Sequence, residues 1–134
     1  MKKYLVAGLG NIGPEYHDTR HNIGFQILDC LAEEMGFTFE SERLGHVGTF
    51  KIKGRPVICP KPATYMNRSG KAVAAMAGFY KIPPAEILVA HDELDIPAGN
   101  ARFKRGGGHG GHNGLRDIVP ALGNDSDFYR LRNG

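Results

Sequence analysis

Several features that are common in proteins are missing from this sequence, and each absence narrows its class. There is no tryptophan, and the only cysteines are Cys30 and Cys59. One lies in a helical pattern and the other in a strand pattern, so we expect two buried thiols in a reducing compartment rather than a disulfide framework. No apolar run approaches the roughly 20 residues of a membrane span, and no cleavable leader is visible. These absences predict a cytoplasmic protein.

The composition is that of an ordinary globular protein. Hydrophobic residues make up 41% and charged residues 23% of the 134 residues, which excludes global disorder and predicts one domain over residues 1–134. The net charge of +3 is weak evidence for a polyanionic partner. Its distribution says more, because Arg102, Lys104 and Arg105 precede a glycine-rich segment, and Arg130 and Arg132 alternate near the end. This pattern fits phosphate contact and an ordinary solvated surface equally.

Hydrophobic periodicity predicts an alternation of strands and helices. We expect an α/β fold, a single-domain three-layer sandwich with a central mixed, mostly parallel sheet flanked by helices. Ligands bind beyond the carboxyl ends of strands in such sheets, where we place Asn11, Asp92 and the glycine-rich segment. The predicted strands are 2–8, 47–52, 56–59, 87–90, 101–104 and 128–132, and the predicted helices are 25–35, 69–80 and 113–122, the last bent by Pro120.

The glycine-rich segment is the most unusual stretch of the chain. Residues 106–114 contain six glycines and, besides them, only His109, His112 and Asn113. Such a backbone can approach a ligand closely and adopt angles closed to other residues. A flexible linker is the alternative, although linkers are usually padded with serine. We interpret the segment as part of a ligand site.

Two familiar kinds of site fit the sequence poorly. Residues 8–13 satisfy the dinucleotide-binding spacing of three glycines, but Pro14 follows at once, and no acidic residue ends a second strand at the required distance. His109 and His112, with Asp92, are candidate zinc ligands, yet a glycine-rich loop gives them no rigid spacing. We therefore predict no cofactor and no metal, with a metal-dependent hydrolase as an alternative.

A base-catalysed hydrolysis fits the remaining polar residues better. His21 lies at a junction between a loop and a helix, and a carboxylate at Asp92 could hold one imidazole nitrogen so that the other activates water. Neither cysteine has reactive surroundings and no serine lies in a nucleophile turn, which favours water as the nucleophile. The amides of Asn11, Asn67 and Asn113 could donate hydrogen bonds to a carbonyl oxygen. A structural role for His21, in a non-catalytic RNA-binding module, is the competing interpretation.

Three segments resemble one known family. They are GLGNIGPEYHDTRHNIG at 8–24, PATYMNRSGKAV at 62–73 and HDELDIPAGNARFKRGGGHGGHNGLRDI at 91–118, and they resemble bacterial peptidyl-tRNA hydrolase from the first strand to the end of the chain. The resemblance implies cleavage of the ester that joins a peptide to tRNA. It departs from the family at Gly10, Ile12 and Pro120, and the family continues beyond Gly134, so we expect a C-terminally truncated chain with lower stability and weakened activity.

The resemblance also implies roles for individual residues. His21 would activate water, Asp92 would orient it, and Asn11 would sense the blocked amino group of the substrate. The expected partner is peptidyl-tRNA alone, bound by a monomer without an obligate protein partner. Residues implied to line the cleft for the peptide and the tRNA 3′ end are Tyr16, Tyr65, Met66, Asn67, His112 and Asn113, and those implied to hold tRNA phosphates are Arg102, Lys104 and Arg105.

Overall fold

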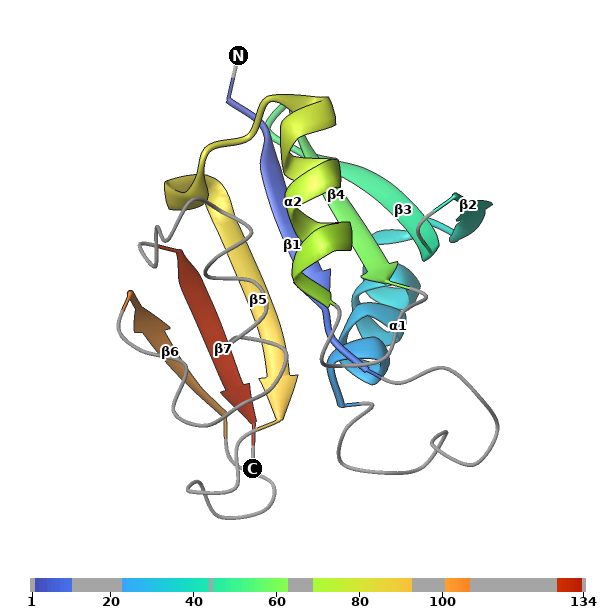
Figure 1. Cartoon of the computed structure of the whole chain (residues 1–134). Helices are drawn as coiled ribbons and strands as arrows, with labels where there is room; N and C mark the ends of the chain where they lie inside the picture. Colours follow the sequence, from blue (N-terminus) through green and yellow to red (C-terminus); the bar gives the residue numbers. More distant parts are fainter. Residues whose placement is uncertain are drawn as a thin grey trace.

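A single mixed sheet forms the centre of the computed structural model (Figure 1). The structure describes residues 2–10, 23–43, 45–62, 69–92, 101–106 and 128–133, and gives only the backbone of residues 69, 92, 101–104, 132 and 133. The seven strands have the order β2-β3-β4-β1-β5-β7-β6. Four of them run parallel, β1 (Tyr4–Gly8), β4 (Arg55–Pro62), β5 (Ile87–Asp92) and β7 (Tyr129–Asn133), and β2 (Glu40–Glu42), β3 (Gly45–Ile52) and β6 (Ala101–Arg105) are antiparallel to their neighbours.

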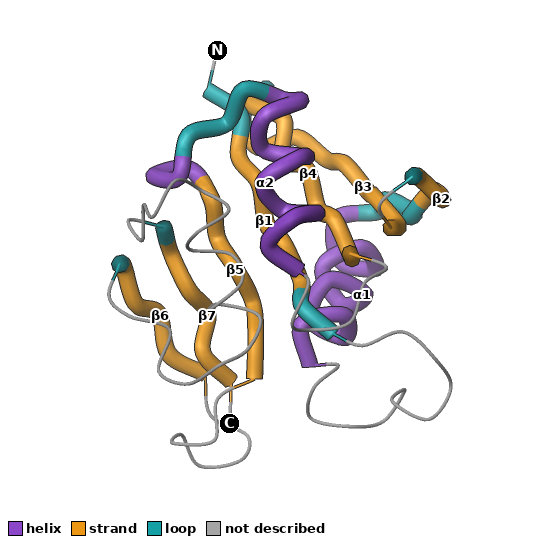
Figure 2. The backbone as a smooth tube through the Cα atoms, in the orientation of Figure 1, coloured by secondary structure: helices purple, strands orange, loops and turns teal. Residues whose placement is uncertain are grey.

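Two helices cover opposite faces of the sheet, which confirms the predicted sandwich. Helix α2 (Ser69–Tyr80) packs on one face and α1 (Ile23–Met35) on the other (Figure 2). The alternation of β1 supplies both cores, because Leu5 and Ala7 join the cluster under α2, whereas Tyr4 and Val6 pack beside α1. Burying one such large apolar side chain contributes about 1.5–3 kcal/mol.

The core under α1 is rich in aromatic rings. Phe37 stacks on Phe50 with ring centroids 5.3 Å apart, and Phe39 meets Phe37 edge to face at 5.4 Å. The ammonium group of Lys61 lies over the Phe39 ring and pairs with Asp29 of α1. The contacts bind the segment after α1 to the β3–β4 hairpin and hold α1 in register on the sheet.

The predicted helix bounds at 69–80 are those of α2, and α1 ends one residue before Gly36 as expected. Gly36 takes a left-handed conformation (φ 73°), and its N–H donates to Ala32 O at 2.9 Å, which closes the helix. Helix α2 carries Val73, Met76 and Phe79 three residues apart, a spacing that predicts one buried face, but Phe79 is 79% exposed. A spacing of three falls 60° short of a full turn at each step, so Ala77 follows Val73 and Met76 into the core.

Three further features differ from the sequence-based expectation. Strand β2 and the short 3₁₀ helix η4 (Pro84–Glu86) were not predicted, since ESE and PAE carry no apolar alternation. Both cysteines are free, as expected, but Cys30 is exposed on α1 and only Cys59 is buried. Cys30 follows Asp29 on the solvent side of α1, away from Leu28. The helix predicted at 113–122 lies outside the described residues.

Candidate functional site

The carboxyl ends of four parallel strands form one edge of the sheet. β1 pairs in parallel with β4 and β5, and β5 pairs in parallel with β7, so Gly8, Pro62, Asp92 and Asn133 end their strands at the same edge (Figure 1). We call it the carboxyl edge. Substrate sites of open α/β sheets lie here. In the sequence, predicted site residues follow β1 at Asn11 and His21, follow β4 at 65–67, and end β5 at Asp92.

A close crossing of two glycines organises this edge. A Cβ on Gly24, near the start of α1, would meet the backbone N and O of Leu9 and would lie 2.6 Å from Ala90 O. A Cβ on Gly8 would collide with the carbonyl group of Gly24 and would lie 2.9 Å from Leu28 Cδ1. Leu9 N donates to Ala90 O at 3.0 Å. Only glycine permits α1, β1 and β5 to meet this closely.

The crossing is adjacent in sequence to all three residues predicted to be catalytic. Asn11 follows Leu9 by two residues, His21 precedes Gly24 by three, and Asp92 follows Ala90 by two. A chain extends by at most about 3.6 Å per residue. The three segments that carry these residues therefore leave from one point of the fold.

Asp92 is the last residue of β5 and is paired in register with Asn133 of β7. The residue before it, His91, is fully buried. Alternation places His91 on the same face of β5 as Ile87 and Val89, which belong to the core under α2. Because His91 lies on the buried face of β5, the position of Asp92 lies on the opposite face. The alternation in the sequence I-L-V-A-H-D already predicts that these two positions lie on opposite faces.

The structure describes only some of the residues predicted for the site. Among the cations, Arg102 and Lys104 stand in β6, opposite Arg132 and Arg130 of β7, and Arg105 ends the strand. The guanidinium carbon of Arg105 is 5.5 Å from the centroid of the Tyr129 ring, and the side chain is exposed. Predicted site residues that lie outside the described residues are Asn11, Tyr16, His21, Tyr65, Met66, Asn67, His112 and Asn113.

Two expectations about this end of the chain are wrong. β6 is antiparallel to β7, so the strand before the glycine-rich segment ends at the edge opposite the carboxyl edge, where Gly106 N donates to Phe128 O at 2.9 Å. Residues 107–114 lie outside the described residues. The sequence does not show strand direction, which explains the error. Arg130, expected among the surface cations, is only 1% exposed, with its guanidinium carbon 4.5 Å from the Phe128 ring centroid.

The buried thiol is not a candidate nucleophile. Cys59 lies inside β4 with no exposed surface, and its Sγ points to Val57 O at 4.0 Å. Burial raises the pKa of Cys59 to about 12, because the apolar surroundings disfavour the thiolate. A buried thiol that stays protonated at neutral pH does not attack an ester, so Cys59 does not serve as the nucleophile.

A large groove lies away from the carboxyl edge. It has a volume of about 760 Å³ and is lined by apolar side chains of β1, β5 and β7 beside α1, including Val6, Leu88 and Leu131. The charged residues that line it are exposed or half-buried, and they are Glu34, Lys53, Arg55 and Glu86. Within the described part of the chain, no group of three or more metal-ligating side chains occurs, and no helix there is long and apolar enough to cross a membrane.

Comparisons with known proteins show which family and which fold this chain resembles. A family model described as "Peptidyl-tRNA hydrolase" matches residues 5–134. Over 132 residues, the chain is 57% identical to the peptidyl-tRNA hydrolase of Azotobacter vinelandii and 58% identical to that of Pseudomonas paraeruginosa, covering 97% of this chain and 68% of each relative. The crystal structure of peptidyl-tRNA hydrolase from Acinetobacter baumannii superposes with a TM-score of 0.91 at 50% identity, covering 97% of this chain and 66% of that one. The chain thus spans about two thirds of the length of these relatives.

Proposed function

This chain belongs to the peptidyl-tRNA hydrolase family, a family of ester hydrolases, and we propose that it hydrolyses the ester between peptide and tRNA with water as the nucleophile. One observation carries the proposal. The glycine crossing ties the end of β1, the start of α1 and the end of β5 to one point of the carboxyl edge, and the three predicted catalytic residues follow or precede that point by two or three positions.

In the proposed reaction, His21 acts as the general base. Asp92 accepts a hydrogen bond from one ring nitrogen of His21, which leaves the other nitrogen free to take a proton from water. The oxygen of that water bonds to the ester carbonyl carbon, and the carbonyl oxygen becomes an oxyanion. When the carbon–oxygen bond to the ribose breaks, the imidazolium returns its proton to the ribose oxygen. The carbonyl double bond reforms at the same time, and the products are tRNA and the peptide acid, which releases its proton to the solvent as a carboxylate.

The remaining predicted residues bind and orient the substrate. Asn11 recognises the blocked amino group of the peptide, and the amides of Asn67 and Asn113 donate to the developing oxyanion. The cations Arg102, Lys104 and Arg105 neutralise tRNA phosphates, a contact that is independent of sequence and suits an enzyme that accepts many tRNAs. Side chains proposed to line the cleft for the peptide and the 3′ end are those of Tyr16, Tyr65, Met66 and His112.

The chain itself needs no second subunit in this scheme. All described strands belong to one sheet, which supports one domain over residues 1–134. The proposed catalytic residues also come from a single chain. We therefore propose a monomer that acts on peptidyl-tRNA in the cytoplasm, where translation supplies that substrate.

Hydrolysis of N-acetyl-aminoacyl-tRNA by the His21→Ala and Asp92→Asn variants tests the catalytic pair. Loss of a positioned base lowers the rate by about 10²–10⁴-fold, while binding of deacylated tRNA persists because the phosphate contacts remain. His46→Ala is the matched control, since His46 is an exposed histidine of β3. Equal rates for His21→Ala and His46→Ala would contradict the proposal and favour a non-catalytic RNA-binding module.

Asn11 has a separate test. The wild-type chain should hydrolyse a blocked aminoacyl-tRNA faster than the same tRNA with a free amino group, and Asn11→Ala should reduce that preference. A wild-type chain that hydrolyses both substrates equally fast would overturn the role of Asn11 without affecting the role of His21.

A further inference from the structure

Exposed cations gather at the edge of the sheet opposite the carboxyl edge. They come from five places in the sequence: the residues before β1, the β3–β4 turn, the start of β4, the residue after α2 and the end of β6. We call them the cationic edge: Lys2, Lys3, Lys53, Arg55, Lys81 and Arg105, all exposed. The described carboxylates beside them are Glu34 and Glu86.

The topology of the sheet lines these residues up. β1 begins between β4 and β5, with Tyr4 opposite Val57 and Leu5 opposite Ile87. At the far side Arg105 ends β6 opposite Tyr129, the first residue of β7. The row from the β3–β4 turn to β6 crosses six neighbouring strands, which is roughly 24 Å at the usual spacing between strands. Figure 1 shows this edge at the upper side of the sheet.

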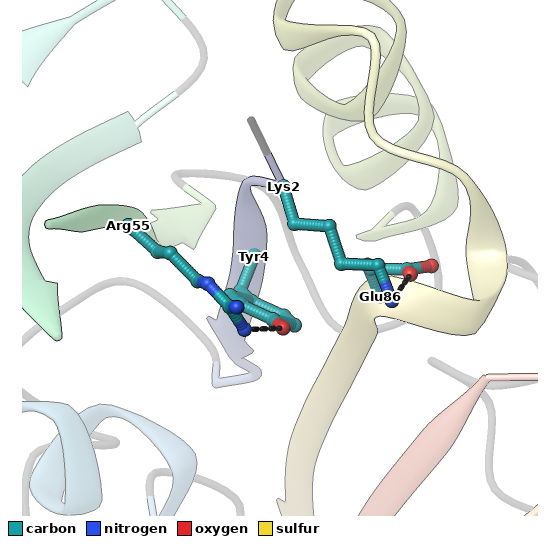
Figure 3. Close-up of polar contacts among 4 residues, drawn as sticks. All are labelled: Lys2, Tyr4, Arg55 and Glu86. Atoms are coloured by element: carbon teal, nitrogen blue, oxygen red, sulfur yellow. Dashed lines mark hydrogen bonds and ion pairs between the residues drawn. The ribbon is translucent and has the colours of Figure 1, made fainter. Parts of the chain in front are cut away.

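Glu86 does not neutralise the middle of the cationic edge. Lys2 Nζ is 3.5 Å from Glu86 Oε1, and Arg55 Nη1 donates to the hydroxyl of Tyr4 at 3.4 Å (Figure 3). Lys2, Lys3 and Lys81 line an open cleft of about 390 Å³ together with Glu86. Three ammonium groups thus share a cleft with one carboxylate, so the cleft attracts anions.

Two lysines of the cationic edge occupy positions that favour glycine. Among the described residues, the non-glycine residues with positive φ are Lys53 (51°) and Lys81 (58°). Lys81 directly follows α2, and its N–H donates to Gly78 O at 3.2 Å, while Ile82 N donates to Ala77 O at 2.8 Å. Glycine would take both conformations with less strain. A lysine at each of two such turns points to a use for its charge.

From this row of charges we infer that the cationic edge binds the phosphate backbone of the substrate tRNA at a distance from the ester. The inference rests on the proposed function, which makes a polyanion the substrate. β1 separates the two edges by about 17 Å, and tRNA is a polymer that extends well beyond its 3′ end. Contacts of this kind are independent of sequence and sensitive to salt.

The test measures how removal of charges from the cationic edge changes the affinity for deacylated tRNA. Lys53→Gly and Lys81→Gly remove a charge at positions where glycine fits the backbone, and Arg55→Gln is added to make a triple variant. We expect the triple variant to bind about tenfold more weakly at 0.1 M salt, with the slope of log affinity against log salt reduced by about two to three. Arg43→Gln, which removes an exposed cation from the β2–β3 turn at the carboxyl edge, should change affinity less than twofold.

Kinetics separate this surface from the ester chemistry. On N-acetyl-aminoacyl-tRNA the triple variant should show a raised KM and an unchanged kcat, and on the same blocked aminoacyl ester of a short CCA oligonucleotide it should match the wild type. Loss of kcat with both substrates would overturn the inference, as would equal weakening by Arg43→Gln. If the chain hydrolyses neither ester, the proposed function fails, and binding of deacylated tRNA still reports on the cationic edge.

A membrane surface is the other polyanion that a basic edge could meet. Vesicles of phosphatidylserine and phosphatidylcholine provide the comparison. The inference requires the triple variant to lose affinity for tRNA. Loss of affinity for the vesicles with unchanged affinity for tRNA would assign the cationic edge to an anionic membrane and would overturn the inference.

Discussion

The two edges of the sheet use glycine in opposite ways. At the carboxyl edge, Gly8 and Gly24 stand where any side chain would collide with backbone, although neither has a positive φ. At the other edge, Lys53 and Lys81 adopt the left-handed backbone that favours glycine. At the carboxyl edge, glycines without side chains allow backbone segments to pack closely. At the cationic edge, lysines occupy a backbone conformation that is strained for residues with a side chain.

The difference matches what each edge is proposed to do. A hydrolytic site needs its residues held within a few tenths of an ångström, and crossing backbones provide rigidity that loops lack. A surface for phosphates needs charge more than precision, because electrostatic attraction tolerates variation in distance. Substitutions at the carboxyl edge should therefore act on folding and rate together, and substitutions at the cationic edge on substrate affinity.

The largest effect is expected from Gly24→Ala. The new Cβ would press on Leu9 N, Leu9 O and Ala90 O, all backbone atoms that cannot rotate away, so we expect the free energy of unfolding to fall by about 3 kcal/mol. Urea unfolding measures the loss, and hydrolysis of blocked aminoacyl-tRNA should fall with it even where the protein is folded. Retention of full stability and rate would show that the crossing does not organise the site.

Gly78→Ala is the matched control for this substitution. Gly78 lies inside α2, and a Cβ there would have nothing within 4 Å, so the replacement should raise the free energy of unfolding by about 0.5–1 kcal/mol. Opposite signs at Gly24 and Gly78 would separate steric exclusion from a general effect of replacing glycine.

Cys59 lies in β4 between the two edges, and its ionisation depends on whether it stays buried in the folded sheet. Its pKa is raised to about 12 by burial, so between pH 9 and 12 the unfolded thiol loses its proton while the folded thiol keeps it. Stability therefore falls as pH rises through this window, by up to about 1.4 kcal/mol per pH unit, and is unaffected by this group below it. Urea unfolding from pH 8 to 10 measures the slope, which Cys59→Ala should reduce.

A chemical readout checks the same group. In a Cys30→Ala background Cys59 is the remaining thiol, and a thiol reagent should modify it only as the sheet opens. An equal pH slope with and without Cys59, or rapid modification of the folded protein at pH 8, would contradict the burial of this thiol.

Much of the fold could be predicted from the sequence because its order is local. The apolar run of the first strand at residues 4–6, the helix over 69–80 and the glycine after Met35 depend on neighbouring residues. Strand direction cannot be predicted in this way, because it depends on pairing between distant segments. For this reason the end of β6 was predicted at the wrong edge. The burial of Arg130 and the exposure of Phe79 likewise depend on which elements cover each face.

The candidate site divides along the same line. His21, Asn11 and Asp92 were recognised from residue types and from a family resemblance, and their roles remain predictions. The glycine crossing beside them was not predicted, although Gly8 and Gly24 both belong to the segment that resembles the family. The sequence does not show that two glycines 16 positions apart come into contact. The cationic edge was missed for the same reason, since its six residues are scattered from Lys2 to Arg105.

The smallest effect is expected from Lys53→Gly and Lys81→Gly, measured singly by thermal unfolding. A left-handed backbone costs an L-residue roughly 1–2 kcal/mol, and part of the gain from glycine is lost to the greater entropy of the unfolded chain. Each variant should be more stable by about 0.5 kcal/mol, a rise in Tm of about 2 °C. Gly54→Ala is the reverse control, because Gly54 has φ 80° with open space around it and should lose about 1 kcal/mol. If the glycine variants are more stable but bind tRNA more weakly, the lysine charges serve binding at the expense of stability. If the glycine variants are less stable, the lysines have a structural role, and the contrast between the two edges is wrong.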